Sequence, residues 1–311
     1  MTVADGSQVR LADVTEATPG TIPATPTFQV MRYVDSDLRV AKQTDVPNEV
    51  TPDLNVRSIV DVGRSVAGSI NTLLSFGTFD TWLARLFRSE WSSDVLKNSV
   101  LDKTGTLENT FKHGATSSFL RYYGVRWNTL DLTLRARQSV QANWGVMGIG
   151  SPTPTSAIIS GATYTNPTET PVFNAALNVG ALALGGVTAS PKMQALTMRI
   201  NGNVRQDDVL GQYEPYGHGL GRFEVTGTMT TYFENLYAYQ AILDHDDVGL
   251  TVPLTDELGN SYTIAMPKMK LLDGGPRGTG NGNAVIMDVP FQAYYDATSA
   301  ATMSITRAVA P

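Results

Sequence analysis

The stretch RSVAGSINT at residues 64–72 alternates between two kinds of side chain, and it decides how the rest of the chain is interpreted. In an extended chain, successive side chains point to opposite faces. One face would carry Val66, Gly68, Ile70 and Thr72, and the other Ser65, Ala67, Ser69 and Asn71. The alternation predicts a strand from Arg64 to Leu74 with one apolar face and one face of small polar residues.

A second stretch, FEVTGTMTT at residues 223–231, repeats this pattern. Both share V-x-G-[ST]-[IM]-x-T, which places Gly68 opposite Gly227. Upstream, FQVMRYVDSDLR at 28 aligns with QALTMRINGNVR at 194, so that Leu38-Arg39 matches Val204-Arg205. Alternating sequence is common in β proteins, so chance similarity between the two stretches is the alternative explanation. The shared order of elements favours two related β domains in tandem.

Each of these strands is followed by an amphipathic helix. FDTWLARLF at 79–87 spaces its apolar residues for a helix that packs on a sheet, with Thr78 as the expected N-cap. Its stripe contains Phe79, Trp82, Leu83 and Leu86, and the stripe predicted for NLYAYQAIL contains Leu236, Tyr239, Gln240 and Leu243.

Further strands are predicted on either side. Phe28 to Asp35 forms a strand, and KQTDVPNEVTPDLN at 42–55 a long loop. YGVRWNTLDLTLRAR ends the first copy, with a strand that continues through QSVQANWGVMG. AVIMDVPFQAYYD ends the second copy, which adds a hairpin turning near Glu257 to Asn260.

These elements divide the chain into five parts. Pro, Thr and Gly before residue 28 and the Pro- and Ala-rich stretch after 150 favour extended, linking chain. The prediction is an extended N-terminal arm at 1–27, a first domain at 28–150, a linker or arm with one short strand near PVFNAALNVGALAL at 151–192, a second domain at 193–298 and a C-terminal tail at 299–311.

Composition excludes several classes of protein. A net charge of −6 argues against a protein that binds nucleic acid by neutralising phosphates, so any contact with DNA should be weak. The sequence contains no cysteine, so disulfides and thiolate metal ligands are absent. No apolar run reaches the length of a membrane span, and we expect a protein that folds in the cytoplasm without a membrane partner.

Signals for catalysis or metal binding are weak, and we predict no enzyme activity, catalytic residue, cofactor or metal. His113, His218 and His245 lie in separate segments without metal-ligand spacing. The run from Asp244 to Asp247 reads as a solvated helix end, because it lacks the spacing of a calcium loop. GGPRGTGNGN at 274–283 lacks the G-K-[ST] of a phosphate loop and reads as a hairpin tip.

The four tryptophans could form a sugar-stacking platform, but their positions in the helix stripe and on strand faces favour burial in a core or an interface. They are Trp82, Trp91, Trp127 and Trp144.

Together these stretches resemble the duplicated tail tube proteins, or major tail proteins, of phages with long non-contractile tails (siphophages). The resemblance runs from about residue 22 to 307 and is carried by TPATPTFQVMRYVDSDLRVAKQT, DVGRSVAGSINTLLSFGTFDTWLARLFRSEW, FLRYYGVRWNTLDLTL, GLGRFEVTGTMTTYFEN, FQAYYD and MSITRA. It implies a mainly β chain of two tandem tail-tube-type β-sandwich or barrel domains, each with one flanking α-helix. It also implies a homo-oligomer whose trimers form stacked, pseudo-sixfold rings in the virion tail, around a lumen for genome passage.

On this interpretation the small polar strand faces would line the lumen, and the apolar faces would form the cores. The lumen-facing candidates are Ser65, Ser69, Asn71, Thr129, Asp131, Glu224, Thr226, Thr228 and Thr230. The core candidates are Val66, Ile70, Trp82, Leu86, Leu130, Leu132, Val225, Met229, Tyr239 and Leu243. An ordinary solvated sheet face would fit the polar set equally well.

The partners implied are further copies of the chain, other tail proteins (tape measure, terminator, baseplate) and double-stranded DNA in transit. Two alternatives remain open: a receptor- or carbohydrate-binding β module of a phage tail, and a terminator or baseplate ring protein.

Overall fold

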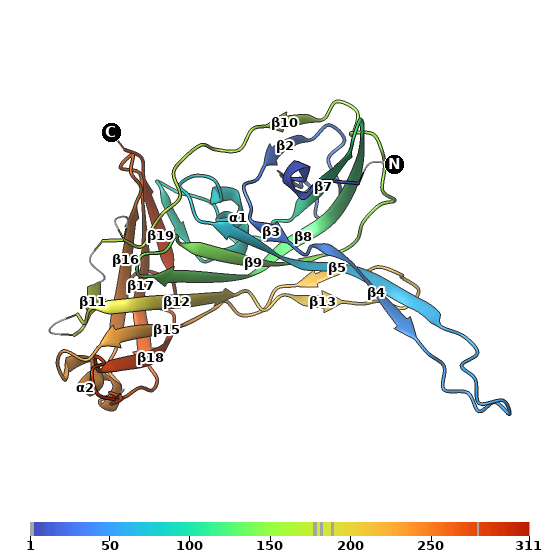
Figure 1. Ribbon diagram of the computed structural model, residues 1–311. Helices are drawn as coiled ribbons and strands as arrows, with labels where there is room; N and C mark the ends of the chain where they lie inside the picture. The colour runs from blue at the N-terminus through green and yellow to red at the C-terminus, as the bar shows by residue number, and fades with distance from the viewer. Residues whose placement is uncertain (1–2, 177–178, 181–182, 188–189, 279, 311) are drawn as a thin grey trace.

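The computed structural model describes residues 3–176, 179–180, 183–187, 190–278 and 280–310, and it is mainly β (Figure 1). The first half of the chain contains a short 3₁₀ turn at Gly6–Gln8, then β1 (Arg10–Thr15), β2 (Thr27–Val30), β3 (Asp35–Ser36), β4 (Arg39–Asp45), β5 (Val60–Leu73), α1 (Asp80–Leu86), β6 (Val95–Lys97), β7 (Gly105–His113), β8 (Thr116–Arg135), β9 (Gln141–Gly148) and β10 (Thr163–Thr165). The second half contains β11 (Ala183–Gly185), β12 (Met193–Asn201), β13 (Arg205–Asp207), β14 (Gly217–Gly219), β15 (Glu224–Tyr232), α2 (Tyr237–Leu243), β16 (Val248–Thr255), β17 (Ser261–Leu271), β18 (Ile286–Ala293) and β19 (Ser304–Ala308).

In the first half, the long strand β8 belongs to two layers. Its first part pairs with β7, which continues through β1 and β2 to β10. Its second part pairs with β9, and β5 and then β3 and β4 follow. The helix α1 packs against β8. This arrangement sandwiches an apolar core between the two layers.

The second half uses β17 in the same way. The first part of β17 pairs with β16 and β19, and its end pairs with β18. β18 pairs with β15, and β15 with β12. β11 pairs with the outer side of β16.

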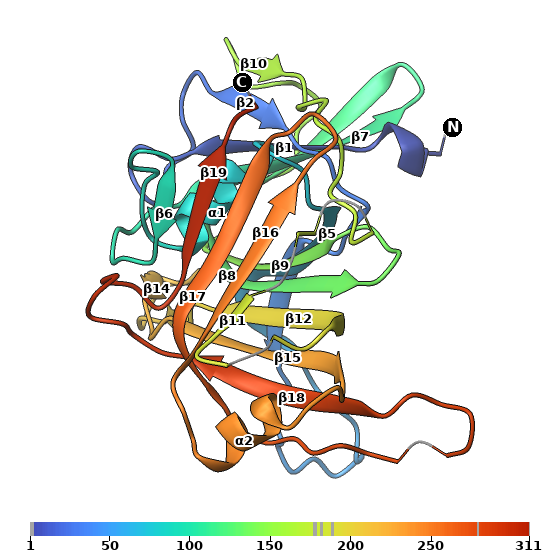
Figure 2. The same cartoon turned by 90° about the vertical axis from the view of Figure 1, so that its left-hand side faces the viewer.

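The two halves join through continuous sheet. β12 pairs antiparallel with the second part of β8, from Ala195 opposite Arg135 to Asn201 opposite Thr129. Figure 2 shows β9, β8, β12, β15 and β18 following one another across this joint. β19 adds a second joint by pairing with β6. Backbone hydrogen bonds in register therefore tie the halves together.

The core of the first half is built round aromatic rings. Trp82 on α1 lies 5.5 Å from Trp127 and 5.4 Å from Trp144, measured between ring centroids, and Phe79 lies beside both Trp82 and Trp144. All four side chains are buried, which excludes Trp82, Trp127 and Trp144 from an exposed sugar platform. Trp91 is half-buried and stacks on Tyr262 from the second half.

The stripe of α1 is buried as predicted, but the stripe of α2 is not, since Leu236 and Leu243 are exposed and Ala238 and Ala241 are buried instead. The predicted N-cap of α1 is also wrong. Phe79 is the N-cap of α1, without a side-chain cap hydrogen bond. The Thr78 hydroxyl instead contacts Ser75 at 2.6 Å and also Thr168. Thr78 is thus used in closing the loop that leads into α1.

Three segments predicted to be an arm, a linker and a tail contain strands that pair with the rest of the sheet. Residues 10–15 form β1, and Leu11 is fully buried because β1 pairs with both β7 and β2. β10 and β11 lie within 151–192, where the expected short strand falls partly on residues 177–178 and 181–182, outside the described part of the chain. β19 lies within the predicted tail and pairs on both sides. The Pro and Gly content of these segments indicated irregular chain, but hydrogen bonding to strands that are distant in the sequence makes them strands.

Two strand predictions are corrected. The strand predicted from Phe28 to Asp35 is broken into β2 and β3, and β4 extends into the predicted loop to Asp45. The strand expected to run on from 123–137 through QSVQANWGVMG ends at Arg135, and the chain turns back as β9. Arg137 has φ of 64°, a turn conformation that the period-2 pattern does not reveal. The hairpin turn expected between Glu257 and Asn260 lies between β16 and β17.

Candidate functional site

One face of the sheet that crosses both halves is polar along its whole width. Register pairs place Asn71 opposite Asn143, Asn143 opposite Asp131, and Asp131 opposite Arg199. The same row continues from Arg199 to Thr226 and on to Gln292. Because strands in register keep their side chains on a common face, this row is one band across β5, β9, β8, β12, β15 and β18.

Rows on either side of this band are also polar. One pairs Ser69 with Gly145 and reaches Glu224 through Thr129 and Asn201. Another pairs Thr133 with Thr197, and Thr197 with Thr228, and the row beyond it pairs Ala195 with Thr230, and Thr230 with Asp288. We call these rows the polar face. It contains every predicted lumen-facing residue except one outlying position: Ser65 lies on the same side of β5, nearer the projecting end.

Most charged groups on the polar face form ion pairs or hydrogen bonds with neighbouring side chains. Arg199 lies 3.4 Å from Asp131, and burial raises the pKa of Asp131 against the opposing effect of Arg199. Asp288 accepts a hydrogen bond from Thr230 Oγ1 at 2.7 Å. Glu224 pairs with Arg222, and hydrogen bonds from Arg222 and Asn203 lower its pKa. The face therefore presents short, mutually hydrogen-bonded side chains and no unbroken run of cations among the described residues.

The opposite faces of the same strands are apolar. Eight of the predicted core residues are at most 2% exposed: Val66, Ile70, Trp82, Leu86, Leu130, Leu132, Val225 and Met229. Tyr239 is partly buried. Leu243 is 65% exposed, so its assignment to the core of the single chain is wrong. Only Ala238 and Ala241 of α2 are buried, because α2 lies at the outside of the structure (Figure 2).

Two arms project from the body and lie side by side (Figure 1). The larger arm is formed by β4, β5 and residues 46–59, and the smaller by β13, β14 and the turn between them. Arg64 Nε donates to Glu214 at 2.8 Å, and Tyr213 Oη donates to Asp61 at 2.6 Å. The tip of the larger arm exposes apolar side chains, with Val50 and Leu54 almost fully exposed. Sequence analysis predicted a long loop at 42–55 but did not indicate that this loop extends an arm.

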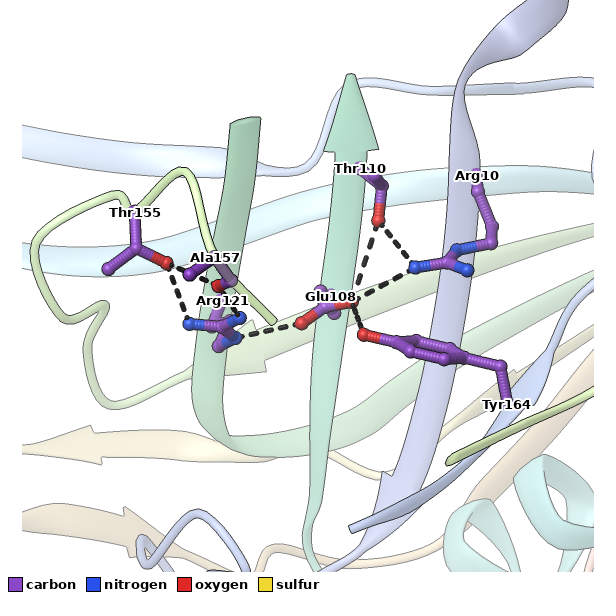
Figure 3. A network of polar contacts seen from close by, with 7 residues as sticks. All are labelled: Arg10, Glu108, Thr110, Arg121, Thr155, Ala157 and Tyr164. Atoms are coloured by element: carbon purple, nitrogen blue, oxygen red, sulfur yellow. Dashed lines mark hydrogen bonds and ion pairs between the residues drawn. The ribbon is translucent and has the colours of Figure 1, made fainter. Parts of the chain in front are cut away.

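A buried ionic network, which sequence analysis also missed, fixes the segment after β9 (Figure 3). Glu108 on β7 is fully buried, accepts from Arg121 Nε at 2.8 Å and from Tyr164 Oη at 2.7 Å, and pairs with Arg10 at 3.5 Å. Burial and the Glu108 carboxylate raise the pKa of Tyr164 to about 12. Arg121 also donates to Thr155 and to the carbonyl of Ala157. The network thus anchors residues 155–164 to the first half.

The histidines are as separate as their sequence positions suggested. His218 is buried beside Arg126, whereas His113 and His245 lie at turns. Within the described residues, no three acidic or histidine side chains gather closely enough to hold a metal ion. Neither helix of the described residues has the length and apolarity needed to cross a membrane. Among the described residues, the polar face therefore remains the candidate functional site.

Comparison with known proteins identifies the family. A family model described as phage tail tube protein matches residues 6–301. The chain belongs to this family. No curated protein matches the sequence significantly. A tail tube protein is a structural component of a virion tail, and the mainly β fold and the organised polar face agree with that role. The matched range includes β1 and all of 151–192.

Proposed function

We propose that this protein is the major tail tube subunit of a long, non-contractile phage tail, and that its copies form stacked rings around a lumen through which the genome enters the host. The observation that carries this proposal is the polar face, which runs without interruption from β5 to β18. In the proposed ring this face lines the lumen, with Ser65, Ser69, Asn71, Thr129, Asp131, Glu224, Thr226, Thr228 and Thr230 toward the DNA.

The chemistry of the polar face suits a conduit. Each phosphate that a protein neutralises adds salt-dependent affinity and would retard DNA in transit. Threonine, serine and asparagine keep the wall wet without supplying charge, and Arg199 is held by Asp131. The net charge of −6 acts in the same direction. Contact with double-stranded DNA is then weak and independent of sequence.

We further propose that the chain contains two related tube domains, so that three chains form a pseudo-sixfold ring. Apart from the short β6, the order β5–α1–β7–β8–β9 in the first half parallels β15–α2–β16–β17–β18 in the second. Gly68 pairs with Val146 and Gly227 with Phe291 at corresponding places. This supports the predicted match of Gly68 with Gly227.

Two irregularities also correspond. The β7–β8 hairpin shifts register between Gly105 and Leu107, and the β16–β17 hairpin shifts between Val248 and Leu250. Arg88 and His245, each two residues after a helix, have φ of 54° and 53°. Left-handed conformations are uncommon outside glycine, so their coincidence favours common descent over chance.

The strand registers change one predicted alignment. Arg39 pairs with Ala67, directly before Gly68, and Arg199 pairs with Thr226, directly before Gly227. Leu38-Arg39 therefore corresponds to Met198-Arg199, and the earlier match with Val204-Arg205 is shifted. The first half likewise has a β7–β8 hairpin, so the β16–β17 hairpin is a shared feature, and β9 corresponds to β18.

On this proposal the projecting arms join one ring to the next, and the ends of the tube contact tape measure, terminator and baseplate proteins. Assembly would take place in the host cytoplasm before the tail joins the virion. Exposed apolar side chains at an arm tip, such as Val50 and Leu54, support a role in contacts between subunits.

Negative-stain electron microscopy of the purified, concentrated protein tests the proposal. Hollow tubes with a regular repeat and three chains per ring are expected. Particles that stop at a single ring would favour a terminator or baseplate protein. Persistent monomers would contradict the tube function and direct the search to receptor and glycan binding.

A further inference from the structure

We infer that neighbouring copies join in a defined register, in which residues 272–277 of one copy pair with residues 37–41 of the next. This inference rests on the proposed ring and on the two related domains. The guide to this register is the joint between the two halves inside the chain.

That guide is the pairing of β8 with β12, which we call the internal junction. It sets Thr129 opposite Asn201, Asp131 opposite Arg199 and Thr133 opposite Thr197. It connects the end of the first domain's sheet to the start of the second domain's sheet. If the domains are equivalent, the end of the second sheet and the start of the first have matching geometry and lie open for another copy.

The open end of the second domain is the continuation of β17. Leu271 pairs with Phe291 as Trp127 pairs with Val146, which makes β17 equivalent to the second part of β8. Beyond Leu271 the chain stays beside β18, because Leu272 N donates to Pro290 O at 2.9 Å and Arg277 bridges Ile286. Opposite residues on β18 and β9 then equate Leu272 with Thr129 and Arg277 with Thr133.

The open start of the first domain is β3 with the beginning of β4. β3 and β4 pair only with β5 among the described strands. Their register on β5 equates Arg39 with Arg199 and Ala41 with Asn201. Asp37 N donates to Ser69 O, which equates Asp37 with Thr197 opposite Thr228.

We apply the register of the internal junction to these two open edges, and it defines the contacts between copies. Leu272 comes to lie opposite Ala41 of the next copy, and Arg277 opposite Asp37 of the next copy. Arg277 and Asp37 are both exposed in the single chain, and they carry opposite charges. Like charges directly opposite on paired strands are destabilising, whereas opposite charges stabilise the pairing.

The corner beside α2 gives a second match under the same transfer. At the internal junction, Phe87 packs on Phe223 with ring centroids 5.4 Å apart. Phe87 corresponds to Asp244, since both directly follow the helix, and Phe223 corresponds to Arg64. The same transfer therefore places Asp244 against Arg64 of the next copy, whose guanidinium also pairs with Glu214 of its own chain. At the internal junction these positions hold a threonine pair, Thr133 and Thr197, and a phenylalanine pair, Phe87 and Phe223. Between chains the equivalent positions hold residues of opposite charge.

The transfer also explains why α2 is exposed. Arg88, after α1, donates to the carbonyls of Gly221 (2.6 Å) and Gly202 across the internal junction. His245 holds the corresponding position after α2. Leu243 is 65% exposed, whereas its counterpart Leu86 is fully buried. In the ring, the next copy's β4 and β5 lie beside this end of α2.

Cysteine cross-linking tests the register, because the chain contains no cysteine of its own. The double variant Ala41→Cys with Leu272→Cys is assembled and oxidised, and its products are separated on a non-reducing gel. We expect covalent dimers and trimers that disappear on reduction. The matched control is Val40→Cys with Leu272→Cys, in which a one-residue slip turns the two thiols to opposite faces and cross-linking falls at least several-fold.

A charge exchange provides a second readout. Asp37→Arg and Arg277→Asp should each reduce tube formation, with circular dichroism showing that all variants fold. The double variant should recover tube formation in part, because an arginine at this position cannot accept the hydrogen bonds that Ser69 donates to Asp37. If wild-type chains form tubes but Ala41 and Leu272 variants do not cross-link and the charge exchange gives no recovery, this register is wrong while the tube function stands. If wild-type chains form no rings or tubes, the proposed function itself fails.

Discussion

Glu108 and Arg121 form an ion pair between neighbouring strands with both side chains removed from water. Their side chains are 0% and 8% exposed, and Arg121 Nε lies 2.8 Å from Glu108 Oε2. Two charges brought out of water lose hydration, and they tolerate this only while each keeps its partners. Arg10 and Tyr164 complete the set around Glu108.

Glu108→Gln should therefore destabilise the chain strongly. It keeps the shape of the side chain but leaves Arg121 buried beside a neutral amide, and loss of one member of a buried pair costs about 3–5 kcal/mol. Urea unfolding followed by tryptophan fluorescence measures the change. Glu234→Gln breaks the exposed pair with Lys192 and should cost less than about 1 kcal/mol. Equal costs for the two variants would contradict the structural role of the network.

His218 should make stability depend on pH. Burial first, and then the nearby Arg126 guanidinium, lower its pKa to about 4 from the ordinary 6.5. Between these values the unfolded chain binds a proton that the folded chain does not. The free energy of unfolding should then fall as pH decreases from about 6.5 to 4, by up to roughly 1.4 kcal/mol per pH unit from this residue.

Unfolding curves at several pH values between 4 and 7 measure this slope. His218→Gln should flatten it, whereas His113→Gln at the β7–β8 turn serves as the matched control and should leave it unchanged. A slope that survives His218→Gln would assign the pH dependence to the carboxylates instead.

Gly227 should not tolerate a side chain. A Cβ at this position would lie 2.3 Å from the Thr197 carbonyl oxygen and 2.4 Å from the Phe291 ring. Gly227→Ala must push β12 or Phe291 aside, at a cost of about 1–3 kcal/mol. Gly217→Ala, with nothing within 4 Å of the added carbon, is the control and should be nearly neutral. Thermal unfolding of the two variants measures the difference in stability.

The sequence predicted the elements that follow a local period. Alternation located β5, β15 and the second part of β8, and helical spacing located α1 and α2. The polar and apolar faces of these strands follow directly from the period of two. Gly68 and Gly227, which the shared V-x-G motif aligned, pair with Val146 on β9 and Phe291 on β18.

The parts of the fold that the sequence did not predict depend on contacts between segments that are distant in the sequence. β1, β10 and β19 are short, and only pairing with β7, β2 and β17 makes them strands. Glu108 and Arg121 look like ordinary surface charges in sequence, since burial is decided by Arg10 and Tyr164 from elsewhere in the chain. Leu243 follows the helical stripe, but whether the stripe is covered depends on neighbours that the period does not specify.

Tube formation should depend on the tip of the larger arm. Val50 and Leu54 are almost fully exposed, and removal of such apolar surface from water is favourable on assembly. Val50→Ser with Leu54→Ser should leave the unfolding transition of the monomer unchanged and reduce or abolish tubes seen by electron microscopy. Thr81→Ser, an exposed change in α1, is the control. Normal tubes from the arm variant would exclude this tip from the contacts between subunits.

Added positive charge on the polar face should make assembled tubes retain DNA. Thr226 and Thr228 lie in the central rows of the polar face, so Thr226→Lys with Thr228→Lys would place ammonium groups along the proposed lumen. Tubes of this variant should bind short duplex DNA with an affinity that falls steeply as salt rises, because phosphate neutralisation releases counterions. Thr306→Lys, exposed on β19, adds charge away from the polar face and should bind DNA weakly in comparison. Fluorescence anisotropy at two salt concentrations measures the difference. If the two variants bind DNA alike, the polar face lies elsewhere than the lumen.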